Sequence, residues 1–116
     1  MNPKGKTALV TGGARRVGKG IVLALAQAGA NVIINYNTSS DDANATLDEA
    51  RTFGVEGLLV QADITDHAQV KQMVQATVER FGTIDLLVNN ASIFEKTPFP
   101  MNDVSAWHRE IGRAHV

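Results

Sequence analysis

The stretch Thr11–Gly20, T-G-G-A-R-R-V-G-K-G, separates an apolar run from an amphipathic one. Thr7–Val10 precedes it as a predicted strand, and a helix is predicted to start near Val17. Glycine allows the backbone to adopt positive φ or to approach a ligand closely. At a helix N-terminus, unpaired backbone N–H groups and the positive end of the helix dipole converge. The stretch therefore predicts a phosphate-binding turn between a strand and a helix.

Two phosphate-binding motifs compete for this turn, beside the alternative of an ordinary strand-to-helix loop. Gly13–Lys19 fits the P-loop pattern G-x-x-x-x-G-K, but that motif needs a following Ser or Thr for Mg²⁺, and Gly20 occupies the position. The strict dinucleotide spacing G-x-G-x-x-G is also absent. The pattern present is T-G-x-x-x-R-x-G, formed by Thr11, Gly12, Arg16 and Gly18.

Composition excludes several classes of protein. The 116 residues are 44% hydrophobic and 20% charged, which is typical of a single globular domain. A net charge of -1 argues against a nucleic-acid interface, and no charge run predicts a membrane surface. The chain has no cysteine, and its three histidines lack metal-ligand spacing, so no metal site is expected. We expect a cytoplasmic protein.

Four short runs are continuously apolar, as in strands that are buried on both faces of a parallel sheet. These runs are Thr7–Val10, Val32–Ile34, Leu58–Val60 and Leu86–Val88. Between them, apolar residues recur at helical spacing. The predicted apolar faces are Val17, Ile21, Leu25 and Ala28 in the first helix, Ala43, Leu47 and Ala50 in the second, and Val70, Met73, Val74, Thr77, Val78 and Phe81 in the third. Asp66 and Gln69 are spaced as a capping box, and Gly82 is the predicted stop of the third helix.

The order β-α-β-α-β-α-β predicts an α/β fold with a Rossmann-type doubly wound parallel sheet. In such a sheet the ligand lies across the carboxyl ends of the strands. After the second strand, Tyr36 occupies the position where an NAD enzyme places an acid for the ribose hydroxyls. An acid there would repel a 2'-phosphate, whereas hydroxyls, amides and an arginine accept it. We therefore expect NADP(H), bound by Arg15 or Arg16 with Asn37, Thr38 and Ser39; alternatively, these residues form a solvated turn that caps the next helix.

Two of these motifs resemble those of the short-chain dehydrogenase/reductase family. Its cofactor turn is T-G-x-x-x-G-x-G, with glycine where this chain has Arg16. Its N-N-A-G motif is similar to N-N-A-S at residues 89–92, with Ser92 in place of glycine. Both departures resemble the pteridine reductase branch, and Phe94 falls where that branch stacks an aromatic ring on the pterin. The resemblance extends from Gly5 to about Glu110.

The resemblance implies roles for individual residues. Asp63 would accept from the adenine amino group while the backbone of Ile64 contacts the ring, although Asp63 alone is as readily a turn residue. Arg16, Ser92 and Phe94 would form one wall of a flat substrate pocket facing the nicotinamide; simple packing is the alternative for Phe94. The complete implied cofactor-binding set is Gly12, Arg15, Arg16, Val17, Gly18, Tyr36, Asn37, Thr38, Ser39, Asp63, Ile64, Asn90, Ala91 and Ser92.

The function implied is that of an NADP(H)-dependent oxidoreductase acting on a pterin-like or carbonyl small molecule. A general 3-oxoacyl or ketone reductase, a non-catalytic dinucleotide-binding module and a P-loop-type module remain alternatives. The family's catalytic Ser and Tyr-x-x-x-Lys are not matched, since Tyr36 is the chain's one tyrosine, so no catalytic residue is assigned and the chain as given is expected to be inactive. The family also implies a homotetramer for the parent protein.

The last six residues, Ile111–Val116, read I-G-R-A-H-V, which a common sequencing adapter encodes in one frame. Gly112 would also break a helix that the family continues. We therefore expect residues 1–110 to be the N-terminal part of a dinucleotide-binding domain, and residues 111–116 to be a non-native tail.

Overall fold

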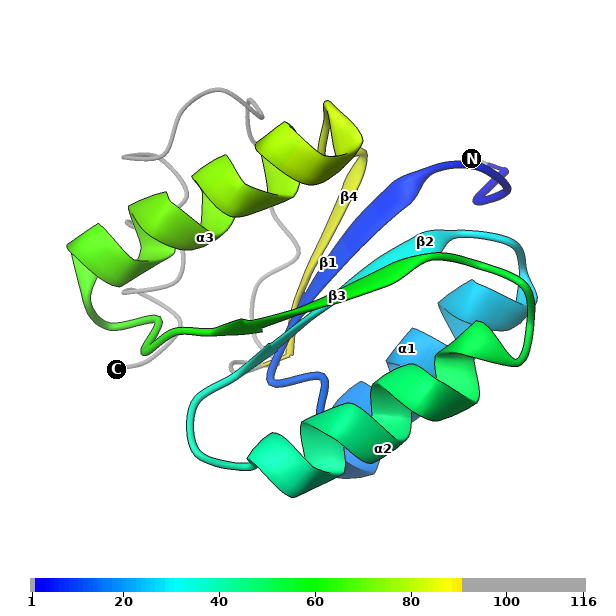
Figure 1. The fold of residues 1–116 in the computed structure, drawn as a ribbon, viewed down its shortest axis with the longest axis horizontal. Coiled ribbons are helices and arrows are strands. Elements are labelled where there is room, and N and C mark those ends of the chain that lie inside the picture. Colours follow the sequence, from blue (N-terminus) through cyan, green and yellow to red (C-terminus); the bar gives the residue numbers. More distant parts are fainter. Residues whose placement is uncertain (1, 91–116) are drawn as a thin grey trace.

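The structure, a computed structural model, describes residues 2–90. The elements follow the predicted order (Figure 1). They are β1 (Thr7–Thr11), α1 (Arg16–Gln27), β2 (Asn31–Tyr36), α2 (Ser40–Arg51), β3 (Gly57–Gln61), α3 (His67–Phe81) and β4 (Leu86–Asn89).

The four strands form one parallel sheet with the order β3-β2-β1-β4. In the central strand β1, Leu9 lies opposite Ile33 of β2 and Leu87 of β4. The chain adds strands outward from β1 to β3 and then crosses back to place β4 on the other side of β1. Helices α1 and α2 cover one face of the sheet and α3 covers the other (Figure 1). The predicted doubly wound α/β architecture is confirmed.

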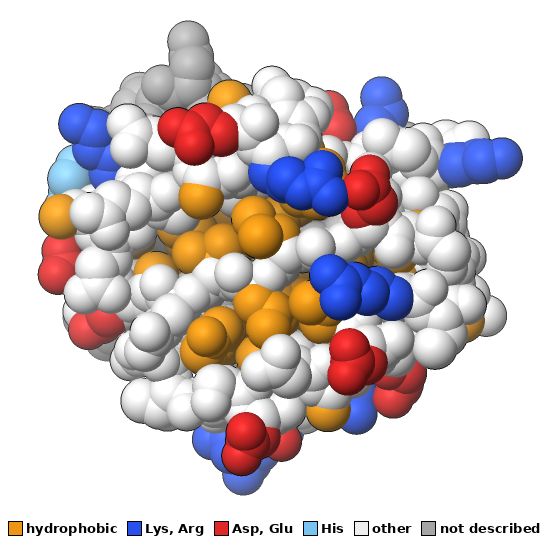
Figure 2. Space-filling model, viewed as in Figure 1, with side chains coloured by type: hydrophobic (Ala, Val, Ile, Leu, Met, Phe, Trp, Pro, Cys, Tyr) orange, Lys and Arg blue, Asp and Glu red, His pale blue; other side chains and the backbone are white. Residues whose placement is uncertain are grey.

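Alternate strand residues supply two cores, one on each face. Leu9 and Ile33 pack with Met73 beneath α3. Val10 and Ile34 point to the other face, with Val22 of α1 and with α2. A strand that is buried on both sides has no polar alternation, which is why the sequence shows continuous apolar runs. Beside the edge strand β3, apolar side chains also reach the surface between α3 and α2 (Figure 2).

The predicted apolar face of α1 is confirmed for Ile21 and Leu25, which are partly buried against the core, but not for Val17 and Ala28, which are exposed. Its buried residues are Gly18, Val22 and Ala26, whereas Val17 is 68% exposed. A Cβ on Gly18 would lie 2.0 Å from the carbonyl oxygen of Gly12, so the side without a Cβ must face the preceding turn. This close approach sets the rotation of the helix, and the apolar periodicity alone does not report it.

Among residues 2–90, no helix combines the length and the apolar character needed to cross a bilayer. The predicted stop of α3 is confirmed, because Gly82 adopts a left-handed φ of 82° and its N–H donates to Val78 O at 2.7 Å.

Candidate functional site: the carboxyl edge of the sheet

Because all four strands are parallel, the residues that follow them meet at one edge of the sheet. The turn of residues 12–15 follows the central strand β1 and leads into α1. The ends of β2 and β4 lie on either side of it. This is the point at which strand order reverses, where open α/β sheets bind their ligands.

The turn and the start of α1 contain two left-handed backbone positions. Gly12 has a φ of 62° and Arg16 a φ of 58°, and no other non-glycine within residues 2–90 has a positive φ. For an L-residue this conformation costs about 1–2 kcal/mol. The positive φ of Arg16 explains why the similar family motif, T-G-x-x-x-G-x-G, has glycine at the position of Arg16. An arginine in its place carries strain, and such strain is characteristic of functional sites.

Gly18 brings α1 into direct contact with the turn. A Cβ there would lie 2.0 Å from Gly12 O and 2.8 Å from Asn90 Nδ2. Asn90 Nδ2 in turn donates to Gly12 O at 3.1 Å. The structure therefore brings together three residues of the predicted cofactor set, Gly12, Gly18 and Asn90.

Asn35, which the sequence reasoning missed, joins three strand ends. Its Oδ1 accepts from the N–H of Gly12 at 3.2 Å, and its Nδ2 donates to Ala62 O at 3.1 Å. Its backbone oxygen accepts from the N–H of Gly13 at 3.1 Å. Asn35 is only 3% exposed, so its amide is held by these partners. The available signal was an asparagine directly after the apolar run V-I-I of the strand N-V-I-I-N-Y.

Two further residues outside the predicted set link β1 with β4. Thr11 Oγ1 donates to Asn89 Oδ1 at 3.0 Å, and Thr11 is fully buried. This bond fixes the end of β4 beside the turn. The predicted residues Ala91, Ser92 and Phe94, which follow β4, lie outside the described residues.

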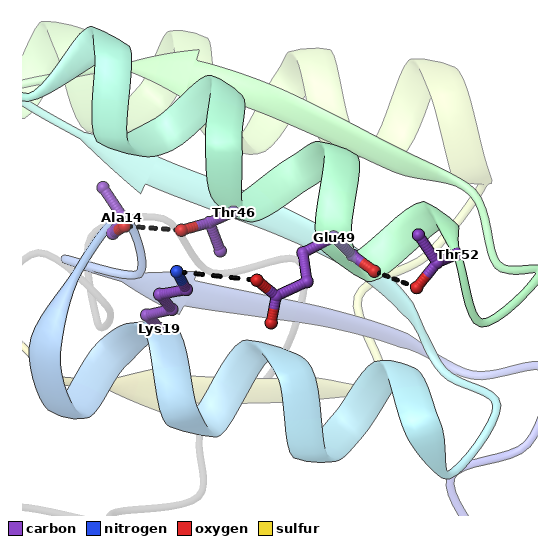
Figure 3. A network of polar contacts seen from close by, with 5 residues as sticks. All are labelled: Ala14, Lys19, Thr46, Glu49 and Thr52. Carbon is purple, nitrogen blue, oxygen red and sulfur yellow. Dashed lines mark hydrogen bonds and ion pairs between the residues drawn. The ribbon is translucent and has the colours of Figure 1, made fainter.

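Helix α2 also holds the turn. Thr46 Oγ1 donates to Ala14 O at 2.6 Å, and Lys19 Nζ lies 3.6 Å from Glu49 Oε1 (Figure 3). Arg15 Nη1 lies 3.9 Å from Asp42 Oδ2. The guanidinium of Arg15 is therefore at the first turn of α2.

The predicted 2'-phosphate segment immediately precedes α2. Tyr36 ends β2, and Asn37 O accepts from Gln61 Nε2 at 2.9 Å. Thr38 O accepts from the N–H of Ser40 at 3.0 Å. Ser39 is the N-cap of α2, but its side chain makes no capping hydrogen bond. The contact with Asp42 therefore places Arg15 beside α2, the helix that follows this segment.

Asp63 takes part in the turn before α3. Its Oδ1 accepts from Thr65 N at 2.9 Å and from Thr65 Oγ1 at 2.7 Å. Its N–H donates to Gln69 Oε1 at 2.8 Å. The turn role that was weighed for Asp63 is present, while its adenine contact stays a prediction. Ile64 is 7% exposed and packs in the core beneath α3.

The start of α3 is closed by its own side chains. Asp66 Oδ1 accepts from Ala68 N at 2.9 Å and from Gln69 N at 3.4 Å, as the capping box predicts. The reciprocal bond differs, because Gln69 Oε1 accepts from Asp63 rather than from Asp66. Hydrogen bonds from the side chain and then the backbone of Gln69 hold the pKa of Asp66 below its ordinary value of 3.8. No cluster of three potential metal ligands occurs in the described part of the chain.

Residues 6–113 match the family described as short chain dehydrogenase. The chain is 46% identical over 88 residues to the 3-oxoacyl-acyl-carrier-protein reductase FabG of Staphylococcus epidermidis, covering 76% of this chain and 36% of that protein. It thus spans about a third of the length of that relative. It is 42% identical over 106 residues to the short-chain dehydrogenase/reductase homolog YusS of Bacillus subtilis, covering 91% and 95% respectively.

Solved structures of short-chain dehydrogenases also superpose on the chain. A short chain dehydrogenase from Burkholderia cenocepacia in complex with NADP superposes with a TM-score of 0.77 at 34% identity, covering 99% of this chain and 51% of that one. A short-chain dehydrogenase/reductase from Serratia marcescens gives 0.76 at 36% identity, covering 97% and 46%. By sequence match and by fold, the chain belongs to the short-chain dehydrogenase/reductase family.

Proposed function

We propose that the protein containing this chain is an NADP(H)-dependent reductase of a small molecule. The observation that carries the proposal is the turn at the strand-order reversal, where no side chain separates Gly12 from Gly18 and the backbone of the turn lies against the start of α1. The diphosphate of a dinucleotide fits such a helix N-terminus. The nicotinamide supplies the hydride when bound, and the chain's own residues bind and orient the cofactor.

The preference for the 2'-phosphate rests on the segment between β2 and α2. Tyr36 replaces the acid that would repel the phosphate, and Asn37, Thr38 and Ser39 are neutral donors. Arg15, which contacts Asp42 in the first turn of α2, would bind the phosphate after leaving that carboxylate. Their 3.9 Å contact joins side chains that are 59% and 52% exposed, so it is weak. The NADP complex of the Burkholderia relative supports this preference.

The substrate class proposed first is pterin-like, and Arg16 carries it. Its strained backbone places an arginine where glycine would be relaxed. A guanidinium can donate in a planar, bidentate manner to a flat heteroaromatic ring. Ser92 and Phe94 would complete that wall of the pocket.

A 3-oxoacyl thioester is the second candidate, favoured by the 46% identity to a 3-oxoacyl reductase. The matched 88 residues cover 36% of that relative. In our proposal the described residues bind the cofactor. Sequence identity in this part of the chain is therefore weaker support for a particular substrate than for a particular cofactor. Catalytic Ser, Tyr and Lys residues, a homotetramer and a cytoplasmic location remain predictions for the parent protein, as does inactivity of the chain as given.

The test is to measure kcat/KM of the complete protein with NADPH and NADH, using a dihydropterin and a 3-oxoacyl thioester as substrates. We expect NADPH to be preferred by about tenfold or more, as for one lost charge-assisted contact, and the dihydropterin to be the better substrate. Better turnover of the thioester would overturn the pterin assignment alone. Binding of NADPH without turnover of any substrate would favour the non-catalytic module, and Mg²⁺-dependent ATP binding the P-loop alternative.

Replacing Arg16→Gly separates its two effects. Relief of the left-handed strain, less the entropy of glycine, should raise the free energy of unfolding by about 0.5–1 kcal/mol. At the same time kcat/KM for the dihydropterin should fall about tenfold, while that for the thioester changes little. Urea unfolding and steady-state kinetics on the same preparation measure both. If Arg16→Gly has the same kcat/KM for the dihydropterin as the wild type, Arg16 is not part of the substrate site.

A further inference from the structure

Thr46 makes a contact that the packing of α2 does not require. It lies inside α2 and is fully buried, and its Oγ1 donates to Ala14 O, 32 residues earlier, at 2.6 Å. Ala14 is itself only 4% exposed. Figure 3 shows the hydroxyl of Thr46 directed out of α2 toward the turn before α1.

A buried threonine in a helix has a simpler partner, the carbonyl four residues earlier in its own helix. Thr77 in α3 shows that arrangement, since it is also fully buried and its Oγ1 donates to Met73 O at 2.9 Å. Thr46 instead satisfies its hydroxyl on another segment. Because a buried hydroxyl without a partner is unfavourable, this bond fixes the distance and direction between α2 and the turn.

The bond orients one peptide group of the phosphate turn. In a trans peptide the C=O and the following N–H point in opposite directions. With Ala14 O held toward α2, the N–H of Arg15 points away from α2. Asn90 and Asn35 hold the Gly12–Gly13 peptide, two positions earlier in the turn, in the same manner, through Gly12 O and Gly13 N respectively.

We propose that Thr46 is a positioning residue for cofactor binding, because it holds the Ala14–Arg15 peptide in the orientation that a diphosphate meets at the start of α1. The inference rests on the proposed function and adds to it a residue outside every implied cofactor contact. The other contacts between α1 or its turn and α2 that involve charges, Lys19 with Glu49 and Arg15 with Asp42, are exposed and contribute little.

The test compares Thr46→Val with Thr77→Val in the complete protein. Each change removes one fully buried hydroxyl and keeps the side-chain shape, but only the first touches the turn. Calorimetric titration with NADPH and NADH should give a Kd about tenfold higher for both cofactors in Thr46→Val, with their ratio unchanged, and no change in Thr77→Val. Amide hydrogen exchange of residues 13–18 in the cofactor-free protein should accelerate only in Thr46→Val.

Thr46→Ser keeps the hydroxyl and should bind both cofactors as the wild type does. If it binds as weakly as Thr46→Val, the methyl group and not the hydrogen bond is responsible, and the inference fails. Unchanged affinity and unchanged exchange in Thr46→Val would also overturn it. If the wild type itself does not bind NADPH, the proposed function fails, and the exchange measurement alone then decides whether Thr46 orders the turn.

Discussion

Helices α1 and α3 both begin at the carboxyl edge of the sheet, but their N-termini are built differently. At α3, Asp66 accepts from two backbone N–H groups, and Gln69 closes the preceding turn through Asp63. At α1, the N-cap is Arg15, which provides no side-chain cap, and the first turn holds no acid. The N-cap of α2, Ser39, likewise makes no side-chain capping hydrogen bond, although the first turn of α2 contains Asp41 and Asp42.

The difference separates stability from function within one sheet edge. An N-terminus capped by its own carboxylate has satisfied its exposed donors and its dipole, which stabilises the fold. A helix N-terminus that lacks such a cap and has glycine and cationic side chains around it is suited to bind an anionic ligand. Both uncapped helices follow the segments to which we assign the cofactor phosphates, whereas the capped helix follows the segment assigned to the uncharged adenine.

The largest effect is expected from Gly18→Ala, which would break the α1 side of this comparison. The new Cβ would lie 2.0 Å from Gly12 O, so the turn or the helix must move, and the free energy of unfolding should fall by about 3 kcal/mol. Gly20→Ala is the control in the same helix, because nothing lies within 4 Å of its Cβ. It should raise stability by about 0.5–1 kcal/mol. Urea denaturation measures the free energy of unfolding of both variants. If the two substitutions change it equally, Gly18 does not lie against Gly12 as described.

Asn35→Ala should have the next largest effect. Removing the side chain leaves the N–H of Gly12 and the carbonyl of Ala62 without this buried partner, which should lower the free energy of unfolding by about 2 kcal/mol and weaken NADPH binding. Asn44→Ala removes an exposed bond to Ser40 O within α2 and should stay within about 0.5 kcal/mol of the wild type. Wild-type NADPH affinity in Asn35→Ala would show that the turn does not depend on this amide.

The smallest effect is expected at the α3 cap. Hydrogen bonds from Gln69 lower the pKa of folded Asp66, so its stabilisation is fully present above the unfolded value of 3.8 and is lost as the pH falls through the lower, folded value. Asp66→Ala should therefore be less stable than the wild type at neutral pH, with a gap that narrows on acidification. Chemical denaturation at a series of pH values measures the gap. NADPH affinity at neutral pH should not change, and a gap independent of pH would refute the capping role of the carboxylate.

The apolar pattern was sufficient to predict the order of the strands and helices between residues 2 and 90, since strands buried on both faces form continuous apolar runs and helices show apolar residues at helical spacing. The rotation of α1 was not predictable in this way, since it depends on contact between Gly18 and the Gly12 carbonyl. Asn35 and Thr46 were missed for a related reason: their partners in the turn lie 23 and 32 residues away. The glycine pattern located the turn, but only the folded chain shows which side chains hold it.

The most direct measurement is amide hydrogen exchange of the complete protein with and without NADPH. Our account predicts protection of residues 12–18 at the start of α1 and of residues 37–40 at the start of α2, with no change at residues 66–70, where α3 is already capped. Equal protection at the start of α3, or none at the start of α1 when NADPH is bound, would contradict it.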